Sequence, residues 1–576
     1  MNSQSIRFIL IAGIVLVGTF LFNSWQQDFA SKNKAVSTVM TEGTSKEIPQ
    51  IPETSATLQN KQAENQATQE IPKIGEIKGA NGEELISAAI PQNRQVQVKT
   101  DVLVLTIDTL GGDIVELDLP KFTDERDPER KGYQLMDNSG KHYYVAQSGL
   151  AGDQGPDIRG VGRGKFTALK STYEIAQGED AITVDLKLVN SRNVEIIKRF
   201  VFQRSSYLID VEYIINNKGK TDYLANFYAR LNRKPAPDSG GGFLGFGIQT
   251  FTGAAVNTIE TPYKKFTFKD IEQKPFEQEV KGGWAAMVEH YFVSAWVPTN
   301  ETLNNYQTKT LDKDIFSVGF VSPTTVIKPG EEGRVGARLY AGPEVTDILE
   351  KVAPGLELTV DYGILWPLCK PIFWLLKKLY LLTGNWGWSI VLITLIIKIL
   401  FYHLSASSYR SMGAMRKLQP KMQALKERHA DDKQKYSQSI MELYKKEKIN
   451  PLGGCLPVVV QIPVFIALYY VLLGSVELRE APFILWITDL SAKDPYYVLP
   501  ILMGITMLIQ QKISPAPPDP MQAKVMMIMP IFFTVLFLNF PAGLVLYWFV
   551  NSVLSITQQW FITRSVERSP NESGAK

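Results

Sequence analysis

The sequence predicts a membrane α-helical bundle of six spans joined to a large all-β domain. Apolar runs that can cross about 30 Å of hydrocarbon as helices occur near the start and throughout the last third of the chain. The middle of the chain instead alternates apolar and polar residues in short runs between turn clusters, which is typical of half-buried strands. The formal net charge of +3 over 576 residues gives no global field of the kind that nucleic-acid-binding proteins have.

The first 95 residues are predicted to contain an anchor and a linker. Residues 1–25 hold an apolar run of about 17 residues, near the minimum for a span, and no small-residue cleavage site follows it. We therefore expect an uncleaved transmembrane anchor and not a signal peptide. Residues 26–95 are rich in Ser, Thr, Gln, Glu, Lys and Pro without a sustained apolar period, and this composition predicts a flexible linker.

Residues 96–350 have the pattern of a large antiparallel β-sandwich. Ile182, Val184 and Leu186 alternate with polar residues, and many runs of this kind are separated by turn residues. A glycine-rich string at 239–247 matches the spacing of a dinucleotide-binding fingerprint, but it follows no predicted strand and opens no predicted helix. We therefore expect a mobile loop there and no nucleotide site.

The last third of the chain is predicted to be embedded in or attached to a membrane. Residues 356–384 place leucines on one helical face and lysines on another, which is typical of an amphipathic helix lying on the bilayer. Five further spans are expected, at residues 385–404, 456–474, 496–513, 525–540 and 543–562. The remaining segments are a basic helical hairpin at 405–455, a loop at 475–495, a loop at 514–524 and a tail at 563–576.

Charge asymmetry between the loops predicts the orientation of the spans. Residues 405–455 contain eleven Lys and Arg against five Asp and Glu, whereas residues 475–495 contain two against four. Because cytoplasmic loops have the excess of Lys and Arg, the hairpin is expected in the cytoplasm. Alternation then places both termini in the cytoplasm and the β-domain in the periplasm. The hairpin is either simply solvated or meets RNA phosphates, such as those of a ribosome.

Polar residues inside the predicted spans are the main functional signal. Lys398 lies in an apolar run, where a lysine costs about 2.5–3.5 kcal/mol at mid-helix. Two interpretations are open: the ammonium reaches the cytoplasmic interface along its own stem, or it faces a watery groove inside the bundle. Other polar side chains within the spans either line the same groove or hydrogen-bond between helices. They are Thr394, Gln461, Tyr547, Asn551, Ser555 and Gln558 or Gln559.

The sequence predicts no metal site, cofactor or catalytic site. Cys369 and Cys455 lie 86 positions apart without a CxxC pattern, and the four histidines are scattered. A transporter or channel is the main alternative to a non-enzymatic membrane machine, because it too would place a lysine in a polar pocket. It predicts an internal repeat, and none is seen between the halves of the chain.

Three strings that run through loops as well as spans indicate a family. They are NPLGGCLP at 450–457, QIPVFIALYYVLLGSVELREAPF at 461–483 and FPAGLVLYW at 540–548. They closely resemble the bacterial YidC branch of the YidC/Oxa/Alb insertases, and the resemblance covers residues 356–562. It implies a membrane protein insertase and chaperone of the bacterial inner membrane, with a five-span core and a periplasmic super-sandwich domain. The partners that it implies are nascent membrane proteins, the Sec translocon and membrane lipids, with no small-molecule ligand and no nucleotide.

The resemblance also implies which residues meet an incoming protein segment. A hydrophilic groove open to cytoplasm and lipid would contain Lys398, at a position where the family usually has arginine. His403 stands where a proline commonly ends this span, so the helix is expected to run on into the hairpin. Phe465 and Trp548 fit a role as lipid-facing or packing aromatics as well as they fit contact with a passing segment. The residues expected near a passing segment are Thr394, Gln461, Ile462, Pro463, Phe465, Tyr547 and Trp548.

Overall fold

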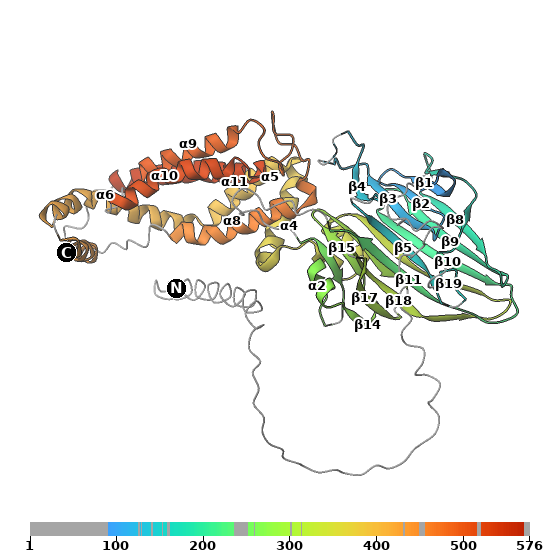
Figure 1. Ribbon diagram of the computed structural model, residues 1–576. Coiled ribbons are helices and arrows are strands. Elements are labelled where there is room, and N and C mark those ends of the chain that lie inside the picture. The colour runs from blue at the N-terminus through green and yellow to red at the C-terminus, as the bar shows by residue number, and fades with distance from the viewer. Residues whose placement is uncertain are drawn as a thin grey trace, which may run out of the picture. The chain divides into compact units, whose positions relative to one another are not determined.

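The computed structural model describes residues 90–568 except for 125–126, 128, 140–141, 153, 158–161, 236–250, 259, 300–301, 313, 430–431, 448–455 and 515–519. The predicted anchor, most of the predicted linker, the glycine-rich string and Cys455 therefore lie outside the described residues. Within them, a part built of strands precedes a part built of helices (Figure 1). This confirms the β-domain and the helical C-terminal region that the sequence predicts.

Two sheets form the β-domain within the described part of the chain. One has ten strands in the order β14-β17-β18-β11-β5-β3-β2-β1-β7, with β4 paired to β3, and the other has nine in the order β13-β12-β15-β16-β19-β10-β9-β8-β6. The strands are β1 (Gln95–Lys99), β2 (Val104–Asp108), β3 (Asp113–Leu119), β4 (Tyr133–Met136), β5 (Tyr144–Ala151), β6 (Thr167–Ala168), β7 (Thr172–Glu174), β8 (Ala181–Val189), β9 (Val194–Gln203), β10 (Leu208–Asn217), β11 (Tyr223–Arg233), β12 (Gly253–Val256), β13 (Lys264–Phe266), β14 (Glu277–Lys281), β15 (Ala285–Glu289), β16 (Phe292–Pro298), β17 (Leu303–Asp312), β18 (Ile315–Ile327) and β19 (Glu332–Pro343).

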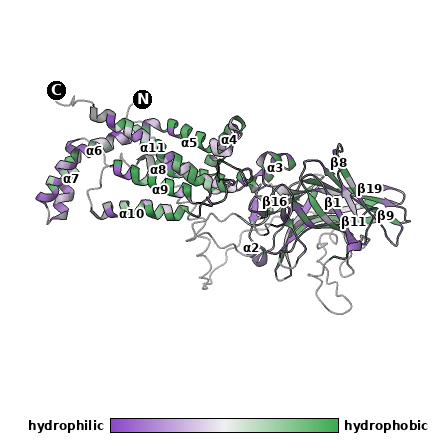
Figure 2. Ribbon diagram, turned by 90° about the horizontal axis from the view of Figure 1, so that it is seen from above, coloured by the Kyte–Doolittle hydropathy of each residue, from purple (hydrophilic) through white to green (hydrophobic). Residues whose placement is uncertain are grey.

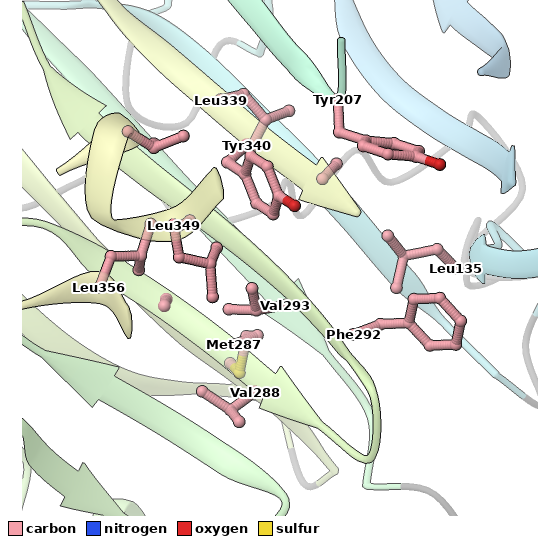
Figure 3. Close-up of a cluster of buried hydrophobic side chains, with 14 of the residues drawn as sticks. Leu135, Tyr207, Met287, Val288, Phe292, Val293, Leu339, Tyr340, Leu349 and Leu356 are labelled. Carbon is pink, nitrogen blue, oxygen red and sulfur yellow. The ribbon is translucent and has the colours of Figure 1, made fainter. Parts of the chain in front are cut away.

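Alternation along the strands buries one face of each sheet. In β9, which pairs antiparallel with β8 and β10, every second residue from Val194 to Phe202 is buried. Val184 and Leu186 of β8 are fully buried on the same principle, so the period of two read from the sequence fits this strand. Figure 3 shows part of the resulting core, where side chains of β15, β16 and β19 gather with Leu349 and Leu356.

Helices dominate the chain after the β-domain. Helices α5, α8, α9 and α10 are rich in apolar residues, and Figure 1 shows α8, α9, α10 and α11 lying alongside one another. The helices are α2 (Phe268–Gln273), α3 (Thr346–Val352), α4 (Trp366–Thr383), α5 (Trp386–Leu400), α6 (Tyr402–Arg428), α7 (Lys433–Lys446), α8 (Leu456–Gly474), α9 (Val498–Ile513), α10 (Pro520–Phe537) and α11 (Ala542–Arg568). Helix α11 packs against α5, α6, α8 and α9, and it is therefore the central helix of this part.

The first of the apolar helices ends in a sharp bend. Helix α5 stops at Leu400 and α6 starts at Tyr402, with an angle of 67° between them. The expectation that the helix runs on into the hairpin past His403 is therefore wrong, because the ladder breaks at Phe401 without help from a proline. Among the described residues, no single helix is both long and apolar enough to cross a bilayer, whereas this bent pair passes that test together.

The helical part exposes apolar side chains that a water-soluble core would hide. Leu400 is 73 % exposed, Met527 64 % and Ile528 62 %. Figure 2 shows the helices α5, α8, α9 and α10 as largely hydrophobic, while α7 is hydrophilic. Apolar surface of this extent marks contact with lipid or with another protein.

Candidate functional site

Helix α5 carries Lys398 in its last turn. The helix begins with Asn385, whose side-chain oxygen accepts a hydrogen bond from the Trp388 backbone N–H at 3.1 Å and so caps the first turn. The residues that follow are almost all apolar, which leaves the half-buried Lys398 as the one charged residue of the helix. Its position follows from the cap and the 15-residue length of α5.

The ammonium of Lys398 is held by helix α11. Lys398 Nζ donates a hydrogen bond to Ser555 Oγ at 2.7 Å. The Ser555 hydroxyl in turn donates to the Asn551 carbonyl at 2.7 Å, one turn earlier. The polar stripe read from the sequence of α11 thus includes a direct partner of Lys398. A hydroxyl is a neutral partner, so the charge itself is not compensated by this contact.

A small, partly open hollow lies beside Lys398, between α5, α6, α8 and α11. Lys398, Gln461 and Asn551, all expected from the sequence to be near one another, lie in its wall. Lys398 is the one formally charged residue among those that line it, and the ion pairs found among the described residues do not include it. The lining residues are Ile397, Lys398, Phe401, Leu404, Ser405, Val460, Gln461 and Asn551.

Gln461 connects the hollow to an aromatic cluster. Its side-chain amide donates to the Tyr547 hydroxyl at 3.4 Å, and Tyr547 is 1 % exposed. The Phe465 ring centroid lies 6.1 Å from that of Tyr547 and 4.8 Å from that of Trp548, with the latter pair edge to face. Phe465 and Trp548 therefore make the ring contacts of packing aromatics. Ile462 of α8 is 49 % exposed, one residue before Pro463.

Of the residues expected in the groove, Thr394, Gln558 and Gln559 do not line the hollow, and Ser555 meets Lys398 without being part of the lining. Thr394 is 1 % exposed, and its hydroxyl donates to the Ile390 carbonyl of its own helix at 2.6 Å. Gln558 is half-buried and lies outside the wall, while Gln559 is 2 % exposed and donates to Ser514 Oγ at 3.4 Å. Helical spacing places these residues on a face, but it does not say which part of that face meets the hollow.

The hollow also contains residues that sequence reasoning missed. Ile397, Phe401, Leu404 and Ser405 lie within two turns of Lys398 along the chain. The spacing of three residues from Lys398 to Phe401 is a signal that could have found Phe401, but Leu404 and Ser405 follow the bend, so helical spacing from Lys398 does not predict their position. Val460 lies beside Gln461 in the same wall, and its apolar side chain gave no such signal.

The part of the chain that the structure describes contains no group of three or more His, Cys, Asp or Glu side chains able to hold a metal ion. Cys369 is buried and not in a disulfide. The chemistry available at the hollow is therefore that of a lysine ammonium, hydroxyls and amides, which can bind or position a polar chain.

The two arms of the basic hairpin pack through a small apolar seam. Leu418 and Met422 of α6 are buried against Ile440 and Tyr444 of α7. Lys421 Nζ lies 2.7 Å from Glu447 Oε1 across the pair. The seam leaves many of the Lys and Arg side chains on the outer surface of the hairpin.

Comparison with known proteins assigns both parts of the chain. Residues 95–375 match the family model described as "YidC periplasmic domain", and residues 378–569 match "60Kd inner membrane protein". Membrane protein insertase YidC of Pseudomonas syringae pv. syringae is 47 % identical over 98 % of this chain and 99 % of the relative. The protein of the same name from Pseudomonas fluorescens is 47 % identical over 99 % of each chain.

Solved structures give weaker likenesses. A crystal structure of an active YidC insertase with the first transmembrane domain resolved has 17 % identity and a TM-score of 0.39, over 81 % of this chain and 92 % of that one. A galactose mutarotase related enzyme from Lactobacillus acidophilus has 11 % identity and a TM-score of 0.28, over 43 % of this chain and 97 % of that one. Identity of 47 % over nearly the full length of its relatives means that this chain belongs to the YidC family of membrane protein insertases.

Proposed function

We propose that this chain is a membrane protein insertase of the inner membrane, and that the hollow at Lys398 receives the polar part of an incoming protein. It acts on nascent membrane proteins and is not an enzyme. The observation that carries the second half of the proposal is the hydrogen bond between Lys398 Nζ and Ser555 Oγ at 2.7 Å, at the wall of a hollow with no other charged residue in its lining. Because the Ser555 hydroxyl is a neutral partner, the Lys398 ammonium can still bind an anion.

The physical basis is an exchange of hydrogen-bond partners. A carboxylate or polar backbone group of the incoming chain replaces the Ser555 hydroxyl as acceptor for Lys398, and a charge-assisted bond is roughly twice as strong as a neutral one. Meanwhile the apolar segment enters lipid along the exposed apolar faces of α9 and α10, at about 25 cal/mol per Å² of apolar surface removed from water. The membrane potential adds about 2.3 kcal/mol per 100 mV for each acidic residue that is translocated. No nucleotide is needed.

We further propose a topology of six spans. The five helices α5, α8, α9, α10 and α11 cross the membrane after the N-terminal anchor at 1–25, with both termini in the cytoplasm and the β-domain in the periplasm. Helix α8 has 19 residues, about 28 Å of helix, which is close to the hydrocarbon thickness. The excess of Lys and Arg in residues 405–455 supports a cytoplasmic hairpin.

Other partners are proposed from surface chemistry. On α4, Lys370 Nζ lies 5.8 Å from the Trp366 ring and Lys378 Nζ lies 6.0 Å from the Trp374 ring. Both tryptophans are more than half exposed, an arrangement suited to lipid headgroups at the bilayer surface. The exposed basic residues of α6 and α7 suit ribosomal RNA phosphates. Cooperation with the Sec translocon is proposed from family membership.

The test is an insertion assay in cells depleted of this chain. Cells are complemented with wild type, Lys398→Arg, Lys398→Ala, Lys398→Glu and the control Lys512→Ala, which removes an exposed lysine of α9. Insertion of a small Sec-independent membrane protein is followed by protease protection. Rescue by wild type, arginine and the control, with failure of alanine and glutamate, supports the proposal. Full rescue by alanine and glutamate rejects the role of Lys398, and failure of wild type rejects the insertase assignment and favours the transporter alternative.

A further inference from the structure

Arg479 joins the loop after α8 to the β-domain. The loop starts with the 3-10 helix Val476–Leu478, and the Arg479 side chain that follows is only 6 % exposed. Its guanidinium carbon lies 5.3 Å from the Tyr133 ring centroid and 5.5 Å from those of Tyr291 and Phe292. Phe292 belongs to the buried cluster of Figure 3. An arginine enclosed by three rings has exchanged water for aromatic contacts.

Hydrogen bonds reinforce this contact from both sides of one residue. Arg479 Nη2 donates to the Thr123 carbonyl at 2.7 Å. Glu480 Oε1 accepts from the Thr123 backbone N–H at 2.8 Å and from its hydroxyl at 2.6 Å. Two neighbouring residues of the loop therefore satisfy the donor and the acceptor of one residue that is more than 350 positions away in the chain.

A second contact reaches the end of α8 itself. His290, in the turn between β15 and β16, places Nε2 2.9 Å from the Leu473 carbonyl oxygen. Because a carbonyl only accepts, Nε2 is the protonated nitrogen in this contact. Leu473 is the penultimate residue of α8, whose last carbonyls have no partner within the helix. The β-domain thus supplies a donor to the C-terminal end of α8.

One residue on each side of the contact between the β-domain and the loop has a left-handed backbone conformation. Tyr291 has φ of 74° and Glu480 has φ of 57°, in the left-handed region that favours glycine. The Tyr291 ring lies beside the Arg479 guanidinium, and Glu480 bonds Thr123, the same residue that Arg479 bonds. Left-handed non-glycine residues persist where the surrounding structure holds them. Here each one presents a side chain that glycine would lack.

We propose that Arg479 is a positioning residue: through it the β-domain holds the outer end of α8, the helix that carries Gln461 in the wall of the hollow. The geometric claim is independent of the insertase mechanism, whereas its consequence for insertion rests on the proposed function. A brace at this end keeps α8 in register with α11 while the hollow is occupied.

The first experiment measures hydrogen exchange on the full chain in nanodiscs. In Arg479→Ala, amides in peptides covering 119–124, 288–293 and 470–481 are expected to exchange at least tenfold faster than in wild type. Arg479→Lys keeps the charge but loses the planar stacking, and an intermediate effect is expected. The control Arg334→Ala, a 56 % exposed side chain on β19, should leave all three peptides unchanged. Acceleration confined to 470–481 overturns the proposal, because Arg479 would then hold only its own loop, and no acceleration overturns it too.

The second experiment asks whether the brace positions the groove. Insertion yield is measured for Arg479→Lys, which keeps the chain folded more safely than alanine, and is expected to fall about threefold to tenfold. An unchanged yield with accelerated exchange overturns the positioning role. Failure of the Lys398 variants to affect insertion would reject the groove instead, and it leaves the exchange result standing.

Discussion

Two buried cations show how differently the β-domain and the helical part treat charge. In the β-domain, Arg163 lies 3.1 Å from Asp157 and also pairs with Asp113, and both carboxylates are almost fully buried. In the helical part, Lys398 has a serine hydroxyl as its partner and a hollow beside it. The first charge is neutralised within the fold, so its role is structural. The second remains available, as a binding site for a passing chain requires.

Apolar residues show the same contrast. Trp284 and Trp296 of the β-domain are 0 % and 1 % exposed, between two sheets that hide them from water. Helices α9 and α10 turn Ile505, Met527 and Ile528 outward. The buried tryptophans suit a domain that is surrounded by water. The exposed apolar side chains of α9 and α10 suit helices that are surrounded by lipid.

The largest effect is expected for Arg163→Met. Removing the guanidinium leaves Asp113 and Asp157 buried without their cation, which should lower the free energy of unfolding of the β-domain by about 3–5 kcal/mol. The measurement is hydrogen exchange of β3 and β5 amides in the full chain. Arg199→Met is the control, because its pair with Asp185 is about one-third exposed and should be worth no more than about 1 kcal/mol. Equal losses in the two variants would contradict the structural role of Arg163.

A smaller effect is expected from pH in the same region. Lys198 Nζ donates to the Gly111 and Ser148 carbonyls at 3.0 Å each, and burial lowers the pKa of Lys198 from its ordinary value of 10.5 to about 7. Between these two values the unfolded chain binds more protons than the folded one. The β-domain should therefore gain stability as pH rises from 7 to 9.5, by at most about 1.4 kcal/mol per unit.

Exchange-derived stabilities of β9 amides at several pH values measure this gain. Lys198→Met removes the titrating group and should flatten the slope, while Lys187→Met, an exposed lysine of β8, should keep it. A slope that survives in Lys198→Met would assign the pH dependence to another group.

The cap of α5 is expected to contribute about 1–2 kcal/mol. Asn385 accepts from the Trp388 N–H, and its amide nitrogen donates to the Pro482 and Phe483 carbonyls of the loop after α8 at 3.2 and 3.1 Å. Asn385→Ala removes all three bonds, whereas Asn385→Asp keeps the acceptor and loses the donors. Exchange of the first-turn amides of α5 should rise strongly in alanine and weakly in aspartate. Equal increases in the two variants would mean that the loop contacts matter more than the cap.

Periodicity in the sequence predicts which residues share a face of a strand or helix, but it does not predict contacts between distant segments. Alternation placed Val184 inside the sandwich, and i, i+4 spacing selected Asn551 and Ser555, which do meet Lys398 or its hollow. Thr394 shares a face with Lys398, yet its hydroxyl bonds its own helix, and no spacing rule distinguishes these outcomes. The contact of Arg479 with Thr123 depends on two distant segments meeting, so no local pattern announces it.

The smallest change in stability is expected for Lys398→Met, the counterpart of Arg163→Met. Loss of a hydrogen bond to a charged group costs about 1.5–3 kcal/mol. Relief from holding an ammonium inside an apolar helix returns about 2.5–3.5 kcal/mol, so the net change should lie between a loss of about 0.5 and a gain of about 2 kcal/mol. Insertion should nevertheless fail, since methionine offers no charge to the incoming chain. Hydrogen exchange of α5 and α11 amides, measured beside insertion yield, separates the two effects. If Lys398→Met destabilised the helices as strongly as Arg163→Met destabilises the sandwich, Lys398 would be a structural cation too. Arg163 and Lys398 would then not differ in role, and Lys398 would not be a charge available to an incoming chain.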